Sequence, residues 1–259
     1  MKYNEFPELT TLLDNDTLLI QEASTLCLKK VKLSTLKQYI GVGTSTSNYG
    51  KYAQEVLKDV PYAYLQLNDL SGLAAIDISQ NEYDCRYQGS VTYQQESSLV
   101  SDPANKSVRF NGNARIVVNP AVSSPTGFLL ECRFKTTSLN GGLFGFDNGS
   151  SYDKDVFLEN GKIKFLNFSG ATILTPNTYN NNQWHTVSAT VGGRGTELWI
   201  DGELIVNSTN TNTQQYSANW FIGWGRYGNY FNGLIDEPII TYKQLSTARI
   251  KARHLAAIS

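Results

Sequence analysis

The sequence is poor in charge, cysteine, histidine and long apolar runs, and each shortage excludes a class of function. Charged residues make up 17% of the 259 residues and the net charge is −1, with no basic cluster that could neutralise a run of phosphates. We therefore expect no binding to nucleic acid. No apolar stretch approaches the roughly 20 residues that span a bilayer, so we expect no membrane insertion. The N-terminus lacks the basic region and apolar core of a signal peptide, which predicts that the chain either stays where it is made or leaves by lysis or assembly.

The three cysteines, Cys27, Cys85 and Cys132, are an odd set without the spacing of a metal cluster. Cys132 falls on one face of a predicted strand with Phe128 and Phe134, which indicates a buried, small apolar side chain. A disulfide between Cys85 and Cys132 is the alternative, although synthesis in a reducing compartment disfavours it.

Neutral polar and aromatic residues are plentiful, with 15 Tyr and 21 Gly. Many short strand patterns follow one another, separated by turn signals and without alternating helices, which predicts a mainly β, antiparallel sandwich. Asn160-Gly161 and Asp201-Gly202 each lie between two apolar runs, as expected of type I′ hairpin turns. A last helix is predicted to begin at an N-cap Ser246. We expect Ile250 and Leu255 to anchor this helix, while Arg249, Lys251 and Arg253 stay in water.

Two C-terminal segments carry a family resemblance. Residues 181–206 read NNQWHTVSATVGGRGTELWIDGELIV, and residues 231–250 read FNGLIDEPIITYKQLSTARI. They resemble the recurrent QWHxV strand, LxxxxDG hairpin and FxGxIDExxIxxxxLS segment of the laminin-G-like, concanavalin A-like jelly roll. The resemblance covers residues 61–259 and implies a jelly-roll sandwich there.

The first 40 residues form a separate predicted unit. DTLLIQEA and LCLKKVKL, on either side of Ser24-Thr25, predict a hairpin, and Ser34 caps a short helix, TLKQYI. This pattern is similar to the N-terminal segments of bacteriophage tail fibres and tailspikes, which dock the appendage on the particle, commonly as trimers. A generic hairpin with a helix is the alternative.

Residues 41–60 are predicted to be a linker and a short helix. GVGTSTSNYG has linker composition. In KYAQEVLKDV, Tyr52, Val56 and Val60 form one apolar stripe of a helix. The stripe packs either on the jelly roll or against copies of itself at a symmetry axis.

No catalytic site is expected. Glycosidases related to this sandwich carry Glu-x-Asp-x-x-Glu on one strand, because a retaining mechanism needs two carboxyl groups about 5 Å apart. The nearest string, EYDCRY, has Glu82 and Asp84 but places Tyr87 where the third carboxylate belongs. Asp236 and Glu237 would point to opposite faces of a strand.

The two histidines, His185 and His254, also predict no catalysis. His185 shares a strand face with apolar residues and is expected to be a packed, hydrogen-bonded histidine. His254 is expected to be a solvated group on the last helix. No serine or phosphate-binding motif accompanies them.

One loop suits a metal ion. Laminin-G-like domains often hold one Ca²⁺ near the rim, and the loop containing Asp147, Asp153 and Asp155 offers the hard oxygen ligands that Ca²⁺ prefers. A merely solvated acidic loop is the alternative. No other cofactor is expected.

An aromatic segment is the candidate for carbohydrate binding. WFIGWGRYGNYF contains six aromatic residues in twelve, and sugar rings stack on exposed aromatic planes while Arg side chains bind hydroxyls. Trp224 and Tyr227, with Arg226 between them, are predicted to be exposed at the glycine-rich turn. Phe221 and Phe231 are expected to be in the core.

Together these features predict a virion appendage protein of a bacteriophage, not an enzyme. Its lectin-like head would bind a host-surface glycan, and its N-terminal segment would bind other virion proteins, as a homotrimer. The chain would be assembled in the host cytoplasm and located in the virion. Two alternatives remain: a purely structural decoration or fibre subunit, and a polysaccharide hydrolase.

Overall fold

The computed structural model of the chain describes residues 17–21, 28–32, 49–100, 102 and 104–259. The chain forms two compact units, Met1–Tyr49 and Gly50–Ser259. In the first unit, β1 (Thr17–Gln21) and β2 (Leu28–Lys32) pair antiparallel, which confirms the strands of the predicted hairpin. Its turn and the predicted helix at residues 35–40 lie outside the described residues.

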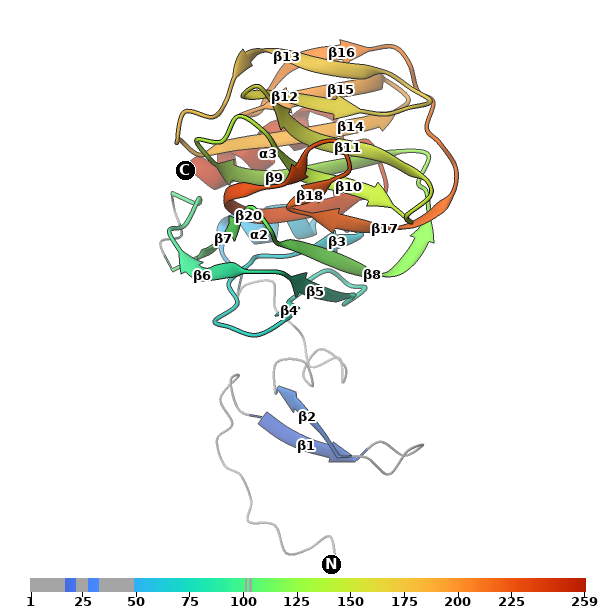
Figure 1. The fold of residues 1–259 in the computed structure, drawn as a ribbon. Coiled ribbons are helices and arrows are strands. Elements are labelled where there is room, and N and C mark those ends of the chain that lie inside the picture. The colour runs from blue at the N-terminus through green and yellow to red at the C-terminus, as the bar shows by residue number, and fades with distance from the viewer. Residues whose placement is uncertain (1–16, 22–27, 33–48, 101, 103) are drawn as a thin grey trace, which may run out of the picture. The chain divides into compact units, whose positions relative to one another are not determined.

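The second unit contains two large antiparallel sheets (Figure 1). The front sheet has the order β13–β12–β11–β10–β17–β8–β5–β4. In that order its strands are Thr172–Thr178, Lys162–Leu166, Tyr152–Glu159, Gly141–Asp147, Ser217–Ile222, Arg115–Ser123, Asp84–Gln88 and Ala74–Ala75.

The back sheet has the order β16–β15–β14–β9–β20–β7–β6, and β3 pairs with β20. In that order its strands are Glu203–Ser208, Gly195–Ile200, His185–Gly192, Phe128–Lys135, Asn232–Thr241, Ser107–Asn111 and Val91–Gln95, with β3 at Ala63–Tyr64. A separate two-stranded hairpin joins β18 (Trp224–Gly225) to β19 (Asn229–Tyr230). The predicted antiparallel sandwich is thus confirmed.

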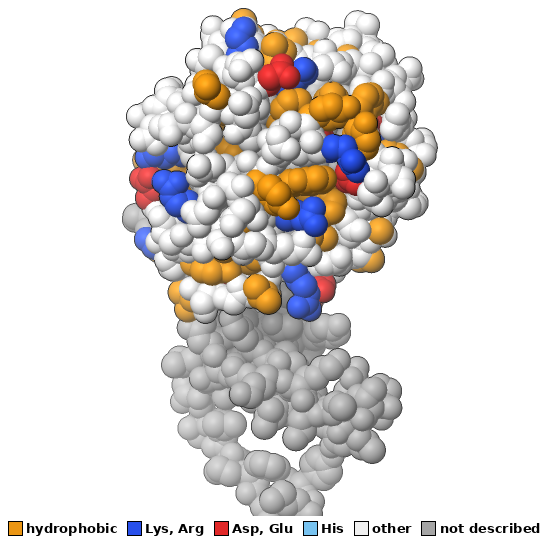
Figure 2. Space-filling view, viewed as in Figure 1, with side chains coloured by type: hydrophobic (Ala, Val, Ile, Leu, Met, Phe, Trp, Pro, Cys, Tyr) orange, Lys and Arg blue, Asp and Glu red, His pale blue; other side chains and the backbone are white. Residues whose placement is uncertain are grey.

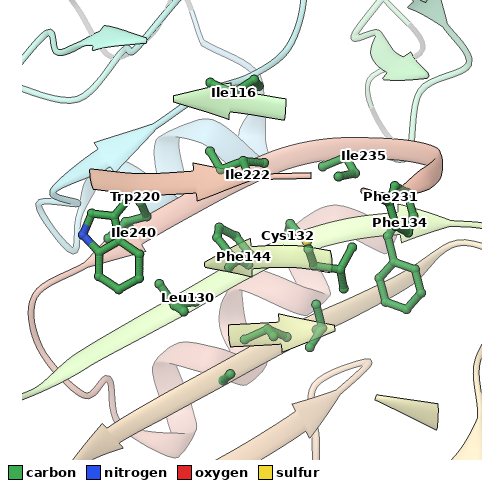
Figure 3. Close-up of a cluster of buried hydrophobic side chains, with 14 of the residues drawn as sticks. Ile116, Leu130, Cys132, Phe134, Phe144, Trp220, Ile222, Phe231, Ile235 and Ile240 are labelled. Carbon is green, nitrogen blue, oxygen red and sulfur yellow. The ribbon is translucent and has the colours of Figure 1, made fainter. Parts of the chain in front are cut away.

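The core lies between the two sheets (Figure 3). The predicted face of β9 is confirmed, because Phe128, Cys132 and Phe134 are all fully buried. Cys85 is also buried, and both cysteines are free thiols, so the alternative of a disulfide between them is wrong. Phe231 belongs to this core as expected.

Both predicted type I′ turns are confirmed by the backbone. Asn160 and Gly161 have φ values of 52° and 79°, and Asp201 and Gly202 have 52° and 78°. Type I′ turns need positive φ at both central positions, which Asn, Asp and Gly tolerate best. These turns set the registers of β11 with β12 and of β15 with β16.

Helices α2 (Lys51–Leu57) and α3 (Thr247–Ile258) pack against each other. Arg249 on α3 forms ion pairs with Glu55 and, over 2.9 Å, with Asp59. Helix α2 therefore lies in the same compact unit as the sandwich, and its apolar stripe is buried there, except for Val60, which is 56% exposed. Among the described residues no helix is long and apolar enough to cross a membrane.

Helix α3 begins as predicted, because the Ser246 side chain accepts a hydrogen bond from the backbone N–H of Arg249. Its anchoring residues differ from the prediction. Ile250 is buried, but Leu255 is 58% exposed and Arg253 is fully buried. Arg253 points inward because it forms ion pairs there with two carboxylates, Asp59 at 2.9 Å and Glu131 on β9 at 3.5 Å.

Candidate functional site

The β18–β19 hairpin lies on the outer face of the front sheet, over β10 (Figure 1). Two glycines of β10 make room for it. A Cβ atom on Gly142 would lie 2.2 Å from the backbone nitrogen of Gly225, and one on Gly145 would lie 3.0 Å from the carbonyl oxygen of Trp224. Real Cβ atoms essentially never approach as closely as at Gly142, and a Cβ at Gly145 would be unusually tight, so the hairpin rests on β10 where that strand has no side chain.

The turn of the hairpin completes an exposed group of three rings, which we call the aromatic cluster: Tyr152, Phe168 and Tyr227. The ring centroid of Tyr152 lies 5.4 Å from that of Phe168 and 5.6 Å from that of Tyr227. The ring centroids of Phe168 and Tyr227 are 5.9 Å apart. Phe168 is 45% exposed and Tyr227 is 48% exposed. Hydrophobic side chains gather on this face with Lys and Arg side chains beside them (Figure 2).

Arg226 holds the cluster in place. Its guanidinium lies over the Tyr152 ring, 4.4 Å from the centroid. It also donates to Asp147 over 2.8 Å and to the carbonyl oxygen of Gly149 over 3.1 Å. Charge-assisted hydrogen bonds of this kind fix the planar guanidinium, and the stacked ring is fixed with it.

Beneath the turn lies a buried carboxyl group, Asp155 on β11. Its Oδ2 accepts a hydrogen bond from the backbone N–H of Tyr227 over 3.2 Å, and its Oδ1 has no partner among the described residues. Burial first, and then the charges of Asp147 and Asp153, raise the pKa of Asp155 to about 7. The hairpin therefore rests on a group that titrates near neutral pH.

The three aspartates predicted to bind Ca²⁺ are engaged separately. Asp147 pairs with Arg226, and Asp153 pairs with Lys154 over 3.2 Å, where both side chains are fully buried. Within the part of the chain that the structure describes, no group of three or more His, Cys, Asp or Glu side chains is placed to hold a metal ion. The arrangement gives the calcium expectation no support.

A second group on the same face, the Arg115 cluster, consists of Arg115, Phe221 and Trp224. The Phe221 and Trp224 rings meet edge to face at 5.0 Å, and the Arg115 guanidinium lies 4.6 Å and 5.2 Å from their centroids. Of the three residues predicted for sugar binding, Arg226 and Tyr227 are exposed, but Trp224 is half-buried. Phe221 is buried, as expected, but it packs on the outer face and not in the core cluster between the sheets.

Sequence reasoning missed Tyr152 and Phe168. Tyr152 begins β11, Phe168 lies in the turn after β12, and Tyr227 lies in the hairpin. No motif or period links positions so far apart. Only the pairing of β10 with β11 and of β11 with β12 brings them together.

The other carboxylates considered for catalysis lie in two different environments. Glu82 and Asp84 are exposed, and Asp84 pairs with Arg86 over 2.9 Å. Asp236 and Glu237 are both fully buried, and the regular strand on which their expected opposite faces depended is not present. The register of β20 shifts between Asp236 and Ile239, and Glu237 has a φ of 54°, so strict alternation is lost there.

The histidines differ in outcome. His185 bonds to Asp201 Oδ2 over 2.8 Å and to Asn181 Oδ1 over 3.0 Å, as a hydrogen-bonded structural histidine should. His254 is half-buried and therefore only partly solvated, and this burial lowers its pKa. The expectation fails because α3 places His254 against the turn at Gly202.

Solved structures share this fold at low sequence identity. One is the ligand binding domain of botulinum neurotoxin serotype D in complex with N-acetylneuraminic acid (18% identity, TM-score 0.57, 80% of this chain and 52% of that chain). Another is domain 4 of AbnA, an extracellular arabinanase from Geobacillus stearothermophilus, in complex with arabinotriose (16% identity, TM-score 0.58, 75% and 98%). The chain thus spans about half the length of the neurotoxin domains it matches.

The comparison with curated proteins gave no match. The family model described as the concanavalin A-like lectin/glucanases superfamily matches residues 110–251, from β7 through the first turn of α3. That match covers more than half of the chain and includes both segments that carried the resemblance in the sequence. The chain belongs to the concanavalin A-like lectin/glucanases superfamily.

Proposed function

We propose that residues 50–259 form a non-catalytic, lectin-like module that binds carbohydrate through the aromatic cluster and Arg226. The observation that carries the proposal is that three rings from separate elements meet at the surface, with Phe168 45% and Tyr227 48% exposed. Rings that stay exposed contribute less to the core than buried ones, so their convergence indicates a partner. Aromatic planes stack on sugar rings, and the remaining donors of Arg226 suit sugar hydroxyls.

The fold-level likeness supports this proposal. Two similar structures were solved with N-acetylneuraminic acid and with arabinotriose. The identities are 18% and 16%, so the likeness extends to the fold, and the ligand site of this chain is argued from its own residues.

We further propose that the protein is a bacteriophage virion appendage. Residues 1–40 would dock it to other virion proteins, commonly as a homotrimer, and the head would bind a host-surface glycan. The support is the N-terminal sequence pattern, together with the antiparallel pairing of β1 and β2 inside it. A purely structural decoration or fibre subunit is the alternative.

The test of carbohydrate binding is a glycan array followed by calorimetry on the best ligand. We expect Tyr227→Ala and Phe168→Ala each to weaken binding about tenfold, about 1.4 kcal/mol, with little change in the thermal midpoint. Leu204→Ala is the control, because Leu204 is an exposed apolar side chain (42%) on β16 of the back sheet and not part of the cluster.

Two results would overturn the proposal. One is normal binding by both cluster variants, which would place the site elsewhere. The other is no binding to any glycan by the folded wild-type protein, which would favour the structural alternative. Adsorption of the head to host cells, measured beside the array, tests the role in attachment.

A further inference from the structure

Arg115 lies on the face that carries the aromatic cluster and has no carboxylate partner among the described residues. Four of the described Lys and Arg side chains of the front sheet and its hairpin have one: Arg226 with Asp147, Lys154 with Asp153, Lys164 with Glu159 and Arg86 with Asp84. Lys162 on β12 has none within the described part of the chain, but no aromatic ring described there lies beside its charge as at Arg115. Arg115 forms no ion pair with any residue that the structure describes, and it is only partly buried.

The Arg115 guanidinium is nevertheless fixed in position. Its Nε donates to Gln88 Oε1 over 2.9 Å, and its plane covers the rings of Phe221 and Trp224. The two terminal nitrogens have no hydrogen-bond partner among the described residues. A guanidinium held in this way presents a free fork of donors, and such a fork matches a carboxylate, which it can bind through two parallel hydrogen bonds.

The two clusters lie on opposite flanks of one hairpin. Trp224, at its start, contacts β17 and β8 through Phe221 and Arg115, whereas Tyr227, in its turn, contacts β11 through Tyr152. Tyr227 follows Trp224 by three positions in the chain, so their Cα atoms are at most about 11 Å apart. One extended ligand can therefore touch both clusters at once.

The two clusters on either side of the hairpin differ in their net charge. At the aromatic cluster the cation Arg226 is already neutralised by Asp147, which leaves ring planes and hydrogen-bond donors for a neutral sugar. At the Arg115 cluster the positive charge is uncompensated, and a half-buried indole lies beside it. That combination suits a sugar residue that carries a carboxylate.

We propose that the Arg115 cluster is a second subsite, which binds a carboxylate-bearing sugar residue, so that the head recognises an acidic polysaccharide in which such residues neighbour neutral ones. This inference rests on the proposed carbohydrate binding, and it names the class of glycan.

The test uses an array of hyaluronan and xanthan, in which uronate residues neighbour neutral ones, together with alginate and polygalacturonate, which consist of uronate residues only. Each is printed beside its carboxyl-reduced form, and the mixed polymers are the ones expected to bind. We expect the wild-type protein to bind an acidic polymer best and to lose about tenfold in affinity when the carboxyl groups are reduced. Raised salt should weaken binding to the acidic form more than to the reduced form, because exposed charge pairs are screened.

Variants separate the two subsites. Arg115→Gln should lower affinity for the acidic polymer about tenfold and leave the reduced polymer within about twofold. Arg109→Gln is the matched control, since Arg109 is an exposed strand arginine of the back sheet with no ion pair to a described residue. Tyr227→Ala should weaken binding to both forms. Arg115→Lys, which keeps the charge, should bind better than Arg115→Gln, and equal thermal midpoints would show that folding is intact.

The outcomes distinguish this inference from the proposed function. If a neutral polymer binds best, or if neither carboxyl reduction nor Arg115→Gln changes the affinity, the acidic subsite is wrong while carbohydrate binding stands. If no polymer binds to the folded protein, carbohydrate binding itself fails, and the subsite with it.

Discussion

The backbone N–H of Tyr227 donates to Asp155 Oδ2 over 3.2 Å, so the turn that displays the exposed tyrosine rests on a carboxyl group that is 1% exposed. Two further carboxylates, Asp147 and Asp153, add to the effect of burial and raise its pKa to about 7. The carboxyl group of Asp155, which lies under the aromatic cluster, therefore changes its charge near neutral pH.

The first prediction concerns pH and Asp155. Its pKa is about 7 in the folded chain, against ~3.9 in an unfolded one. The folded state thus favours the protonated form, and this stabilisation is complete below about pH 4 and is lost as the pH rises through 7. The full loss is at most about 4 kcal/mol, from 1.36 kcal/mol per pKa unit. Asp155→Asn, which cannot ionise, should lose less stability than the wild type between pH 6 and pH 9 in urea unfolding.

The comparison with Asp155→Asn is needed because other buried carboxyls act in the same direction. Burial raises the pKa of Asp236 to about 6 and raises that of Glu237 as well. Their contributions remain in the variant and cancel in the difference. Stability curves that run parallel from pH 6 to pH 9 would show that Asp155 does not titrate there.

The second prediction concerns the seat of the hairpin. Gly142→Ala would place a Cβ atom 2.2 Å from the backbone nitrogen of Gly225, so the hairpin must move away from β10. We expect an overpacking cost of about 1–3 kcal/mol and a loss of glycan binding larger than that of Tyr227→Ala. Gly193→Ala is the control, because a Cβ there meets nothing within 4 Å. Glycan binding that survives Gly142→Ala unchanged would separate the hairpin from the site.

Local signals in the sequence were sufficient for the fold. Asn160-Gly161 and Asp201-Gly202 define two hairpins because type I′ geometry depends on those residues alone. The face of β9 that enters the core between the sheets follows from the alternation of its side chains, although its other face is buried as well. The start of α3 follows from the Ser246 cap. Each of these features is decided within about ten residues of chain.

The candidate site was only half predictable, because its partners come from distant elements. Arg226 and Tyr227 could be placed on an exposed turn, but Tyr152 and Phe168 join them only through the pairing of β11 with its neighbours. Trp224 was predicted to be exposed because it lies at the same glycine-rich turn. It is half-buried because the guanidinium of Arg115 on β8, more than 100 residues earlier in the sequence, lies over its ring.

The third prediction concerns helix α3, in which Arg253 is buried and Leu255 is exposed, the opposite of what the sequence predicted. Arg253→Ala removes a side chain that is 1% exposed and pairs with Asp59 and Glu131. Asp59 keeps its pair with Arg249, but the buried Glu131 loses its ion-pair partner among the described residues. The expected loss of stability is about 3–5 kcal/mol. Leu255→Ala, on the exposed side, should change stability by less than about 0.5 kcal/mol. Urea unfolding of both variants measures this difference, and equal effects would contradict the packing described for the helix.

The last prediction concerns the boundary of the head and the source of assembly. The fragment 50–259 keeps α2, whose Glu55 and neighbouring Asp59 pair with Arg249 and Arg253, so it should fold with the thermal midpoint of the head in the full chain. The fragment 61–259 lacks both carboxylates and should be less stable or insoluble, as circular dichroism and solubility would show. Residues 1–40 are too few to bury a core alone. We therefore expect light scattering to give an oligomer, a trimer on our proposal, for the full chain and a monomer for 50–259. A trimeric 50–259 fragment would place assembly in the head and contradict the docking segment as its source.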